Sequence, residues 1–474
     1  MVRLRKKYMN NELLAQKYDL LLKDAGTVPG QKREVNSENK YIIRQSERES
    51  NARSYPRRLP IAIAEAKGVY IKDTDNNVYI DCLAGAGSLA LGHNHPVVQE
   101  ALMNTIKSDL PLLTLDITTP VKEEFVDEIF GCLPADFAKD AKIQFCSPSG
   151  SDAIEAAIKL VKTATGRRSM MAFHGGYHGM TNGALAMMGN LGPKNNMTGL
   201  MSDVHFLPYP YEFRSPIKAT GAECHELCSS YVDTILSDPE SGIVKPAGML
   251  MEVVQGEGGV IPAPDAWVRE MRRITQEQDV PLMIDEVQSG MGRTGKIFAF
   301  EHSGITPDVL VLSKAIGGSL PLAVVIYNKK LDKWGPGAHA GTFRGNQLAM
   351  AAGLATIKYI KNNNVVEHVN KVGNRLKKHL ENVMSNSKFI GDVRGRGLML
   401  GVEIINRQDN NKPYGELARM IQRECFERGL IIEVGGRFSG VVRFLPPLII
   451  TEAQVDTVAE IFAEAVKAAE GKIA

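Results

Sequence analysis

The sequence predicts an α/β protein in which a large domain with a mostly parallel sheet is joined to a smaller α+β domain. Short apolar runs alternate with helical patterns between about residues 96 and 363, which is typical of a parallel sheet covered by helices on both faces. Residues 69–81 predict a β-hairpin with an Asn-Asn turn. Towards the carboxyl end, residues 365–386 and 452–469 predict helices on either side of short strands. A chain of 474 residues is long enough for two such domains.

Two charged residues follow two of the apolar runs within the large domain. The run Pro281–Ile284 ends on Asp285, and the run Asp308–Leu312 is followed closely by Lys314. Each run predicts a short buried strand, and open α/β sheets bind ligands at the carboxyl ends of their strands. Pyridoxal phosphate needs these two groups, because a lysine amine bonds to its aldehyde and a carboxylate keeps its ring nitrogen protonated. For an isolated lysine, a position in solvent would be the more ordinary interpretation.

Two further segments match the same cofactor. In the strand–turn–helix pattern Ile143–Leu160, the N–H groups of Gly150 and Ser151 would face a phosphate at the start of the helix. The alternative for this turn is a simple helix cap. In Phe173–Gly179, Tyr177 is flanked by glycines, so the backbone could approach a planar ligand while the ring stacks on it. The alternative is a tyrosine packed on the core.

Seven motifs occur along the chain in the order found in one enzyme family. They are Gly92–Pro96 (GHNHP), Ser149–Ala153 (SGSDA), Met251–Gly259 (MEVVQGEGG), Ile284–Gly295 (IDEVQSGMGRTG), Leu312–Gly318 (LSKAIGG), His339–Asn346 (HAGTFRGN) and Arg443–Leu448 (RFLPPL). From about Tyr55 to the carboxyl end, the sequence resembles the class III (ω-amino acid) aminotransferases, the family of 4-aminobutyrate and ornithine aminotransferases. One such motif would be weak evidence, whereas all seven in order are a strong signal.

The resemblance implies the pyridoxal-phosphate transferase fold of type I. We expect residues 96–363 to form the large cofactor-binding domain. Residues 51–95 and 364–474 are then expected to form a small, discontinuous domain. Residues 1–50 are expected to form an amino-terminal helix and arm. That segment begins with the basic residues Arg3, Arg5, Lys6 and Lys7 and continues with leucines at helical spacing, which favours a docking or dimer-contact helix.

The resemblance also implies roles for single residues around the cofactor. Lys314 corresponds to the lysine that binds pyridoxal 5'-phosphate covalently, and Asp285 to the partner of the pyridine nitrogen. Val287 is expected to pack on the ring face opposite Tyr177. Gln288 is expected to hydrogen-bond the ring hydroxyl oxygen.

Four further residues are expected to bind substrate or the neighbouring subunit. Thr342 corresponds to a residue that reaches the cofactor phosphate of the neighbouring subunit, which implies a homodimer. Arg443 corresponds to the arginine that forks onto the α-carboxylate of glutamate or 2-oxoglutarate. Glu252 is expected to neutralise that arginine while the ω-amino substrate is bound, and Tyr55 is expected to contact substrate.

The amino donor is indicated by the positions where the chain departs from its relatives. Met180 stands where the ornithine and 4-aminobutyrate enzymes carry an arginine that grips a substrate carboxylate, and Ala86 stands where the ornithine enzyme has a tyrosine. Together with the run Ala186–Lys194, these changes resemble the branch of the family that transfers the 4-amino group of L-2,4-diaminobutyrate to 2-oxoglutarate. Its reaction is reversible, passes through pyridoxamine phosphate, and yields L-aspartate 4-semialdehyde and L-glutamate.

Several alternatives stay open at this point. The related transaminase of ectoine synthesis runs the same chemistry in reverse, and ornithine or 4-aminobutyrate aminotransferases belong to the same family. An aminomutase of the same fold is a further alternative. Such an enzyme would need no external 2-oxoglutarate and would have little use for Glu252 and Arg443.

Composition argues against other classes of partner. The formal net charge is +2, which gives no indication of binding to nucleic acid or to a membrane surface. Six cysteines are scattered without the spacing of a disulfide framework, which favours a reducing compartment, the cytoplasm. The segment Cys224–Cys228 contains possible metal ligands but no partner cluster, so we expect no metal site.

Overall fold

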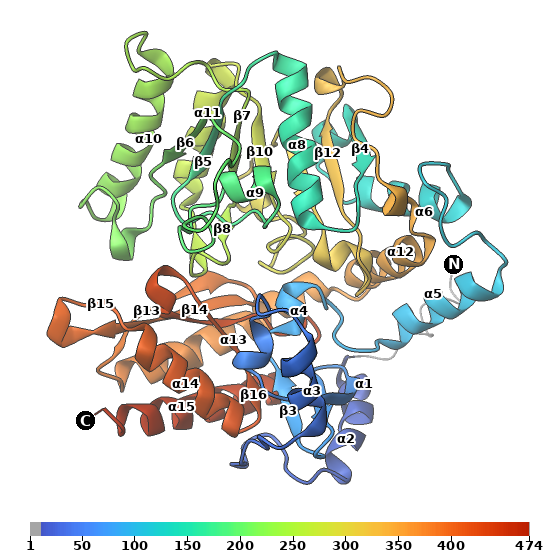
Figure 1. Ribbon diagram of the computed structural model, residues 1–474, viewed down its shortest axis with the longest axis vertical. Helices are drawn as coiled ribbons and strands as arrows, with labels where there is room; N and C mark the ends of the chain where they lie inside the picture. Colours follow the sequence, from blue (N-terminus) through green and yellow to red (C-terminus); the bar gives the residue numbers. More distant parts are fainter. Residues whose placement is uncertain (1–10, 474) are drawn as a thin grey trace. The chain divides into compact units, whose positions relative to one another are not determined.

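The computed structural model describes residues 11–473, and the chain divides into two compact units (Figure 1). Unit 2 spans Val98–Val366, and unit 1 contains the residues on both sides of it. The predicted domain limits at 95/96 and 363/364 lie close to these divisions. Residues 11–50 are grouped with unit 1 rather than standing apart. The basic residues Arg3, Arg5, Lys6 and Lys7 lie outside the described residues.

Unit 2 is built on a seven-stranded sheet with the order β4-β12-β11-β10-β7-β5-β6. The strands are β4 (Ala141–Phe145), β5 (Met170–Phe173), β6 (Val204–Leu207), β7 (Gly248–Met251), β10 (Leu282–Asp285), β11 (Val309–Leu312) and β12 (Val324–Asn328). Only β12 among them runs against its neighbours, because it pairs antiparallel with both β11 and β4. The mostly parallel sheet predicted from the sequence is therefore confirmed.

Helices cover both faces of this sheet. The unit contains α5 (Pro96–Lys107, which begins in unit 1), α6 (Pro120–Phe130), α7 (Ala135–Ala138), α8 (Gly150–Thr165), α9 (Asn182–Ala186), α10 (Gly221–Ser237), α11 (Asp265–Glu277) and α12 (Gln347–Asn362). It also contains the short pair β8 (Val254–Gln255) and β9 (Ile261–Pro262) and the 3-10 turns η2 (Glu212–Arg214), η3 (Ala299–His302), η4 (Lys314–Gly317), η5 (Lys329–Leu331) and η6 (Thr342–Gly345).

The alternation of side chains along β5 shows which helix packs on each face of the sheet. Ala172 lies in the buried cluster that includes the apolar side of α8, from Ala153 to Ala164. The next residue, Phe173, points to the other face and packs edge-on against Trp267 of α11, with ring centroids 5.3 Å apart. Successive side chains of a strand point to opposite faces, so α8 and α11 cover opposite sides of the sheet.

Unit 1 contains two smaller sheets, with the orders β1-β2-β3-β16 and β13-β14-β18-β17. Its strands are β1 (Ile63–Lys67), β2 (Tyr70–Asp73), β3 (Val78–Asp81), β13 (Ile390–Arg396), β14 (Met399–Asn406), β15 (Lys412–Pro413), β16 (Leu430–Ile431), β17 (Glu433–Gly435) and β18 (Val441–Phe444). Its helical segments are α1 (Asn11–Tyr18), α2 (Leu20–Lys23), α3 (Lys40–Arg48), η1 (Tyr55–Arg57), α4 (Ala84–Gly87), α13 (Val365–Ser385, which begins in unit 2), η7 (Arg407–Asp409), α14 (Gly415–Glu427), η8 (Arg437–Ser439) and α15 (Glu452–Glu470).

The predicted hairpin of unit 1 is confirmed, and its turn has a clear physical cause. Strands β2 and β3 pair antiparallel. The Asp73 carboxylate accepts hydrogen bonds from the N–H groups of Asp75 and Asn77, at 2.9 and 2.8 Å. Asn76 takes the left-handed backbone conformation, with a φ of 67°, which asparagine tolerates better than most residues.

The polar segment Gly26–Ser50, part of the expected amino-terminal helix and arm, contains the helix α3. Asn39 starts this helix, because its side chain accepts a hydrogen bond from the N–H of Tyr41 at 3.0 Å. None of the α3 residues is buried. The helix therefore lacks the buried stripe that would have marked it in the sequence.

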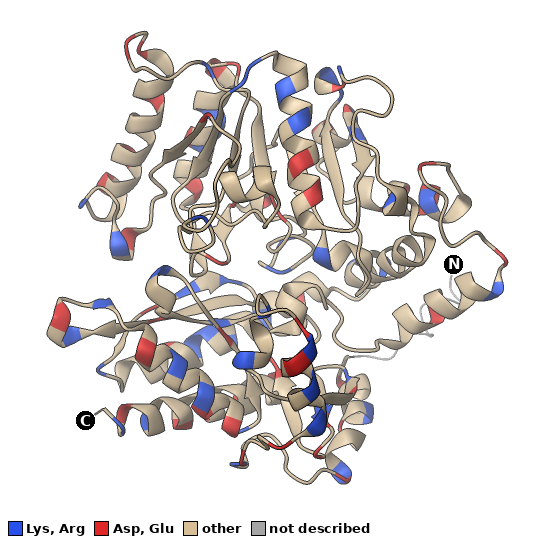
Figure 2. Ribbon diagram, viewed as in Figure 1, with Lys and Arg blue, Asp and Glu red and all other residues tan. Residues whose placement is uncertain are grey.

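Charged residues of both signs are interspersed along the helices of each unit (Figure 2). Within residues 11–473, no helix combines the length and the apolar character needed to cross a membrane.

Candidate active site

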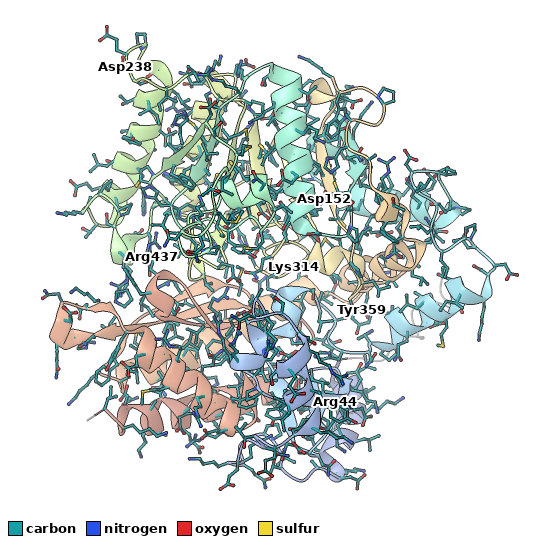
Figure 3. All side chains as sticks on the ribbon, viewed as in Figure 1. Arg44, Asp152, Asp238, Lys314, Tyr359 and Arg437 are labelled. Atoms are coloured by element: carbon teal, nitrogen blue, oxygen red, sulfur yellow. The ribbon has the colours of Figure 1, made fainter. Side chains whose placement is uncertain are left out.

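Asp285 and Lys314 lie at the carboxyl ends of two adjacent parallel strands. Asp285 is the last residue of β10, and Lys314 follows the end of β11 by two residues. The register pairs Asp285 with Val311, so both residues belong to the same edge of the sheet (Lys314 is labelled in Figure 3). This is the edge at which open α/β sheets bind ligands.

The turn that carries Lys314 is strained and tightly held. Lys314 has a left-handed backbone with a φ of 49°, which residues with a side chain seldom adopt. The hydroxyl of Ser313 anchors the turn by donating to the Leu322 carbonyl at 2.8 Å. On the α12 side, a Cβ at Gly353 would lie 1.9 Å from the Ile316 carbonyl oxygen. Such strain persists only where the surroundings enforce it, and it gathers at functional sites.

The Asp285 carboxylate is buried and fixed from two sides. Its Oδ2 lies 2.8 Å from Nδ1 of His178, a hydrogen bond in which the ring N–H donates. Its Oδ1 accepts a hydrogen bond from the N–H of Val287 at 3.0 Å. Both His178 and Asp285 are almost fully buried. The carboxylate is thus held in one orientation at the strand end.

Glu252 holds the loop that contains Tyr177. Its Oε1 accepts from the N–H of Tyr177 and its Oε2 from the N–H of Gly256, each at 2.9 Å. Burial raises the pKa of Glu252 to about 7, against an opposing effect of His178 and with a further contribution from Asp285. Glu252 therefore fixes the backbone at the predicted stacking residue.

The start of α8 is a capped helix end against which other segments pack closely. The hydroxyl of Ser149 accepts from the N–H of Ser151 at 3.2 Å, so that N–H serves the cap. A Cβ at Gly150 would lie 3.1 Å from Cγ1 of Val287, and a Cβ at Gly179 would lie 2.0 Å from Oγ of Ser151. The structure therefore brings together the helix start, the segment after β10 and the end of the Tyr177 loop.

Thr342 lies on an exposed turn, η6, which is tied to β4 and α8. A Cβ at Gly341 would lie 2.4 Å from Oγ of Ser147. Nearby, Nε2 of His339 lies 3.1 Å from Oδ2 of Asp152. Thr342 itself is exposed. Thr342 thus lies at the surface, directly after Gly341, which packs against Ser147.

The other two predicted substrate residues, Arg443 and Tyr55, belong to unit 1. Arg443 lies on β18 and is fully buried. Its Nη2 lies 3.2 Å from Oε2 of Glu433, the residue directly opposite on β17. Tyr55 starts η1, and its carbonyl accepts from the N–H of Arg58 at 2.9 Å. The Arg58 guanidinium in turn lies 3.8 Å from Oε1 of Glu433, so Glu433 links the Tyr55 turn to Arg443.

One group of side chains has the composition of a metal site. Ligand atoms of Cys146, Asp152 and His339 lie within 4.8 Å of one another. Burial raises the pKa of the Cys146 thiol far above its usual value. Burial disfavours the ionised form of Asp152, yet hydrogen bonds from His339 and Ser147 hold the pKa of this carboxyl below its usual value. These bonds account for the group as a network that joins the segment before η6 to the first turn of α8.

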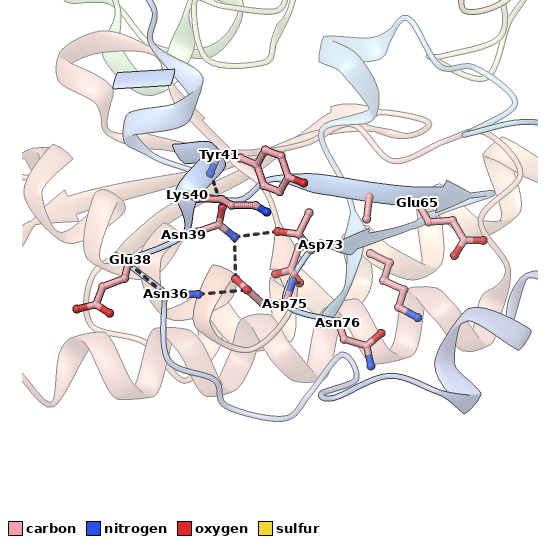
Figure 4. Close-up of a pocket in the computed structure, with 12 residues that line it drawn as sticks. Asn36, Glu38, Asn39, Lys40, Tyr41, Glu65, Asp73, Asp75 and Asn76 are labelled. Carbon is pink, nitrogen blue, oxygen red and sulfur yellow. Dashed lines mark hydrogen bonds between the residues drawn. The ribbon is translucent and has the colours of Figure 1, made fainter. Parts of the chain in front are cut away.

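A polar hollow lies in unit 1, and none of the predicted site residues lines it. It is bordered by α3 and the β2–β3 turn (Figure 4). Nδ2 of Asn39 donates to Oγ1 of Thr74 and Oδ2 of Asp75, at 2.8 and 3.1 Å. Nδ2 of Asn36 donates to Oδ1 of Asp75 at 3.1 Å. These hydrogen bonds attach the segment that leads into α3 to the β2–β3 hairpin. The polar residues that line the hollow therefore have a structural role.

Comparison with known proteins places the chain in a family. Residues 51–466 match the family described as aminotransferase class-III. The chain belongs to the class III aminotransferases. It is 56% identical over 431 residues to the diaminobutyrate–2-oxoglutarate aminotransferase of Rhizobium meliloti strain 1021, covering 90% of this chain and 92% of that protein. It is 46% identical to the enzyme of the same name from Haemophilus influenzae, covering 91% and 95%.

Solved structures of transaminases share the fold. An amine transaminase from an uncultivated Pseudomonas species, described in its PLP-bound form, superposes with a TM-score of 0.79 at 25% identity, covering 93% of this chain and all of that one. The ornithine aminotransferase of Toxoplasma gondii ME49 superposes with a TM-score of 0.77 at 23% identity, covering 93% and 97%. The predicted fold, enzyme class and pyridoxal phosphate dependence are thereby confirmed.

The residues of this class III aminotransferase fit pyridoxal phosphate at the β10–β11 edge. The Asp285 carboxylate is buried and oriented, which suits a partner of a protonated ring nitrogen. Lys314 offers an amine from a turn that fixes its backbone. Gly150 leaves the start of α8 without a Cβ, as close approach of a phosphate requires. Bound there, the cofactor would supply an electron sink for the substrate.

Two residues of this aminotransferase that contact predicted site residues were not themselves predicted from the sequence. His178 stands in the quoted glycine-rich segment, but its contact with Asp285 joins residues 107 positions apart. Glu433 was not singled out, although it lies directly opposite Arg443. A short strand followed by two glycines before Arg443 is the signal that could have indicated a cross-strand partner for the arginine.

Proposed function

We propose that the chain transfers the 4-amino group of L-2,4-diaminobutyrate to 2-oxoglutarate, which gives L-aspartate 4-semialdehyde and L-glutamate. The observation that carries this proposal is the 56% and 46% identity to two enzymes named for this pair of substrates. Met180, which is exposed and uncharged, distinguishes the chain from the ornithine and 4-aminobutyrate enzymes, which carry an arginine at this position.

In this proposal, Lys314 transfers a proton and Asp285 keeps the cofactor ring protonated. The Lys314 amine holds the cofactor covalently and, once the donor amine has displaced it, moves the proton away from the substrate carbon. Asp285 keeps the ring nitrogen protonated. His178 acts through Asp285 as a positioning residue, and the 2.8 Å contact supports this role.

Five further residues are proposed to hold the cofactor. Tyr177 and Val287 pack on its two ring faces, and Gln288 donates to its hydroxyl oxygen. Gly150 and Ser151 face its phosphate. The contact between Gly150 and Val287 supports a shared site, whereas the cap bond to Ser149 leaves the Ser151 hydroxyl better placed than its N–H to meet a phosphate.

Substrate recognition is proposed to depend on Arg443, Glu252 and Tyr55. The guanidinium of Arg443 takes the α-carboxylate of 2-oxoglutarate in a two-pronged hydrogen bond. Glu252 covers Arg443 during the donor half-reaction, so that diaminobutyrate does not present its α-carboxylate there and react at the wrong amine. Tyr55 contacts the substrate from the turn that leads to Arg58.

The proposal is tested by a panel of amino donors with 2-oxoglutarate as acceptor. The panel comprises 2,4-diaminobutyrate, ornithine, 4-aminobutyrate, lysine and putrescine. We expect the highest kcat/KM for 2,4-diaminobutyrate, and a preference for ornithine would overturn the assignment. Sustained turnover without added 2-oxoglutarate would instead indicate an aminomutase.

A homodimer is proposed, with Thr342 completing the cofactor site of the neighbouring subunit. The support comes from an exposed apolar surface around η6. Phe343 is 60% exposed, and Leu112, Leu115 and Ile117 are 48%, 48% and 69% exposed. Backbone hydrogen bonds from Thr114 to Gly345 and from Gln347 to Leu112 hold this surface together. Such a patch is typical of a protein–protein interface.

Mixed dimers test this arrangement. If Thr342 acts across the dimer, a pairing of Lys314→Ala with Thr342→Ala subunits contains one site with both defects and one intact site. We expect the mixture to recover activity that neither variant has alone. A mixture with no more activity than its parents would show that Thr342 acts within its own subunit.

Location in the cytoplasm is proposed on the basis of cysteine chemistry. All six cysteines are free thiols, and five of them are buried. Free thiols of this number suit a reducing compartment. The proposed location is thus supported by the free thiol state of the cysteine side chains.

A further inference from the structure

Three charged side chains of unit 1 form a line that the sequence motifs do not reveal. Glu433 lies between two arginines, with Oε2 at 3.2 Å from Nη2 of Arg443 and Oε1 at 3.8 Å from Nη1 of Arg58. Glu433 and Arg443 are buried, whereas the Arg58 side chain is 43% exposed. Each oxygen of one carboxylate therefore faces a different guanidinium.

The backbone of β17 is shaped to hold the Arg443 guanidinium. A Cβ at Gly435 would lie 2.7 Å from Nε of Arg443 and 3.0 Å from its Cζ. Gly435 does not have a positive φ, so the glycine is required by space and not by backbone conformation. The guanidinium thus lies against Gly435, two residues along the strand from Glu433.

We propose that Glu433 competes with the acceptor for Arg443, and that Arg58 receives Glu433 when the acceptor binds. The proposal deepens the proposed function and rests on it at one point, the binding of the 2-oxoglutarate α-carboxylate by Arg443. In the absence of a dicarboxylate, Glu433 is the counter-ion of Arg443 within unit 1. When the substrate carboxylate takes the guanidinium, Glu433 keeps a partner in Arg58.

The physical reason for such an exchange is the cost of an unpaired buried charge. A buried guanidinium or carboxylate that loses its partner is strongly destabilised. With two arginines and one glutamate, every charge stays close to an opposite charge in both states. Glu433 is therefore a positioning residue, because it acts on the substrate through Arg443. Because Glu433 competes for Arg443, it weakens binding of the acceptor carboxylate. The same competition favours release of the product glutamate.

The experiment measures the dissociation constant of glutarate for the cofactor-loaded enzyme by calorimetry. Glutarate has both carboxylates but no keto group, so it reports carboxylate binding without turnover. Removal of the competing charge in Glu433→Gln is expected to tighten glutarate binding about tenfold, the effect of one charge-assisted hydrogen bond. In Arg58→Met, Glu433 loses one of its two guanidinium neighbours in unit 1, so it is expected to compete more strongly for Arg443, and glutarate is expected to bind about threefold more weakly.

The double variant separates exchange from a general charge effect. If Arg58 acts through Glu433, Arg58→Met has no effect on glutarate binding in the Glu433→Gln background. An Arg58→Met effect of the same size in both backgrounds would overturn the proposal. Unchanged or weaker binding by folded Glu433→Gln would overturn it as well. If Glu433→Gln does not fold, Glu433→Asp provides the second background, in which the shorter carboxylate is expected to compete less and to leave a smaller Arg58→Met effect.

Two matched controls test for non-specific effects. Glu403→Gln makes the same change at another buried pair of unit 1, where Oε2 of Glu403 lies 2.7 Å from Nη2 of Arg394. Arg44→Met removes an exposed arginine of α3. Both are expected to leave glutarate binding unchanged. Tighter binding in Glu403→Gln equal to that in Glu433→Gln would contradict a specific role for Glu433.

The KM and kcat values distinguish positioning from damage. Glu433→Gln is expected to lower the KM for 2-oxoglutarate about tenfold while the single-turnover rate with the donor changes little. Arg443→Lys keeps the charge but loses the fork, so it is expected to abolish the tightening. Failure of diaminobutyrate as donor would sink the proposed function yet leave the glutarate series interpretable. Unchanged glutarate binding in Arg443→Lys would remove the role of Arg443 itself.

Discussion

Nδ1 of His178 lies 2.8 Å from Oδ2 of Asp285, and both side chains are buried. The second Asp285 oxygen accepts the N–H of Val287. A carboxylate held on both oxygens cannot rotate away from its partner. The charge that the cofactor ring requires is therefore oriented before any ligand binds, which is the basis of electrostatic preorganisation.

His178→Gln is expected to lower kcat by about 10- to 100-fold, the size expected for loss of one charge-assisted hydrogen bond. Because His178 acts through Asp285, the pH at which the absorbance of the bound cofactor changes should also shift. Spectrophotometric titration of the cofactor-loaded variant measures this shift. His174→Gln, in the same loop at an exposed position, is the control. An unshifted titration in His178→Gln would assign the histidine a purely structural role.

Asp285→Asn keeps the shape of the side chain but removes its charge. We expect kcat to fall about 100-fold or more, while the dissociation constant of the cofactor changes much less. Steady-state rates and cofactor titration of the same preparation provide both numbers. If turnover survives and only cofactor affinity is reduced, Asp285 does not have the assigned role.

Lys314→Ala is expected to bind the cofactor without a covalent link and to show no turnover. The reason is that Lys314 is the lysine of this turn that can bond to the cofactor aldehyde. Mass spectrometry after borohydride reduction detects the link in the wild type. The alanine should also relieve backbone strain only slightly, because it too disfavours a positive φ. Normal turnover by the variant would refute the whole assignment of the site.

Glu252 provides a test based on pH. Burial raises its pKa from 4.5 to about 7, so the folded state binds this proton more tightly than the unfolded state. Its contribution to stability is complete below about pH 4.5 and is lost as the pH rises to 7, by up to about 3 kcal/mol. Glu252→Gln stays neutral and should lack this decline. Urea denaturation midpoints between pH 5 and 8 compare the two proteins, and parallel pH profiles would contradict the shift.

Met180→Arg restores the charge that ornithine and 4-aminobutyrate enzymes carry at this place. The Met180 side chain is 55% exposed, and its N–H donates to Oγ of Ser151 at 3.3 Å, so the exchange should leave the backbone unchanged. We expect kcat/KM for 4-aminobutyrate to rise about tenfold relative to diaminobutyrate, because the new guanidinium attracts both carboxylates but repels the α-ammonium group that 4-aminobutyrate lacks. Met197→Arg, on the exposed loop before β6, is the control. Equal effects of both substitutions would show only a general attraction of carboxylates.

The strand ends that carry Lys314 and Asp285 could be predicted because buried parallel strands are short continuous apolar runs. β10 and β11 lie within one residue of the runs Pro281–Ile284 and Asp308–Leu312. Helices α13 and α15 were likewise predicted nearly to their ends, since each has a long apolar stripe.

Other features depend on contacts that no local pattern encodes. The partner of Asp285 comes from a loop 107 residues earlier. The pairing of Glu433 with Arg443 depends on the register of two strands of three and four residues. Helix α3 escaped prediction because none of its residues is buried and its start is marked only by the Asn39 cap. The sequence therefore indicates which residues stand at strand ends, whereas tertiary packing decides which side chains meet.

Gly353 lies on α12, which contributes no chemical group to the proposed reaction, yet its missing Cβ lets the Lys314 turn keep its place. A survey of single substitutions scored by activity would therefore find an intolerant position in the middle of this helix. The result could easily be misread as a ligand contact. A bulkier residue there should instead yield a folded protein with an inactive lysine, so loss of activity at this position would not identify a residue that touches the substrate.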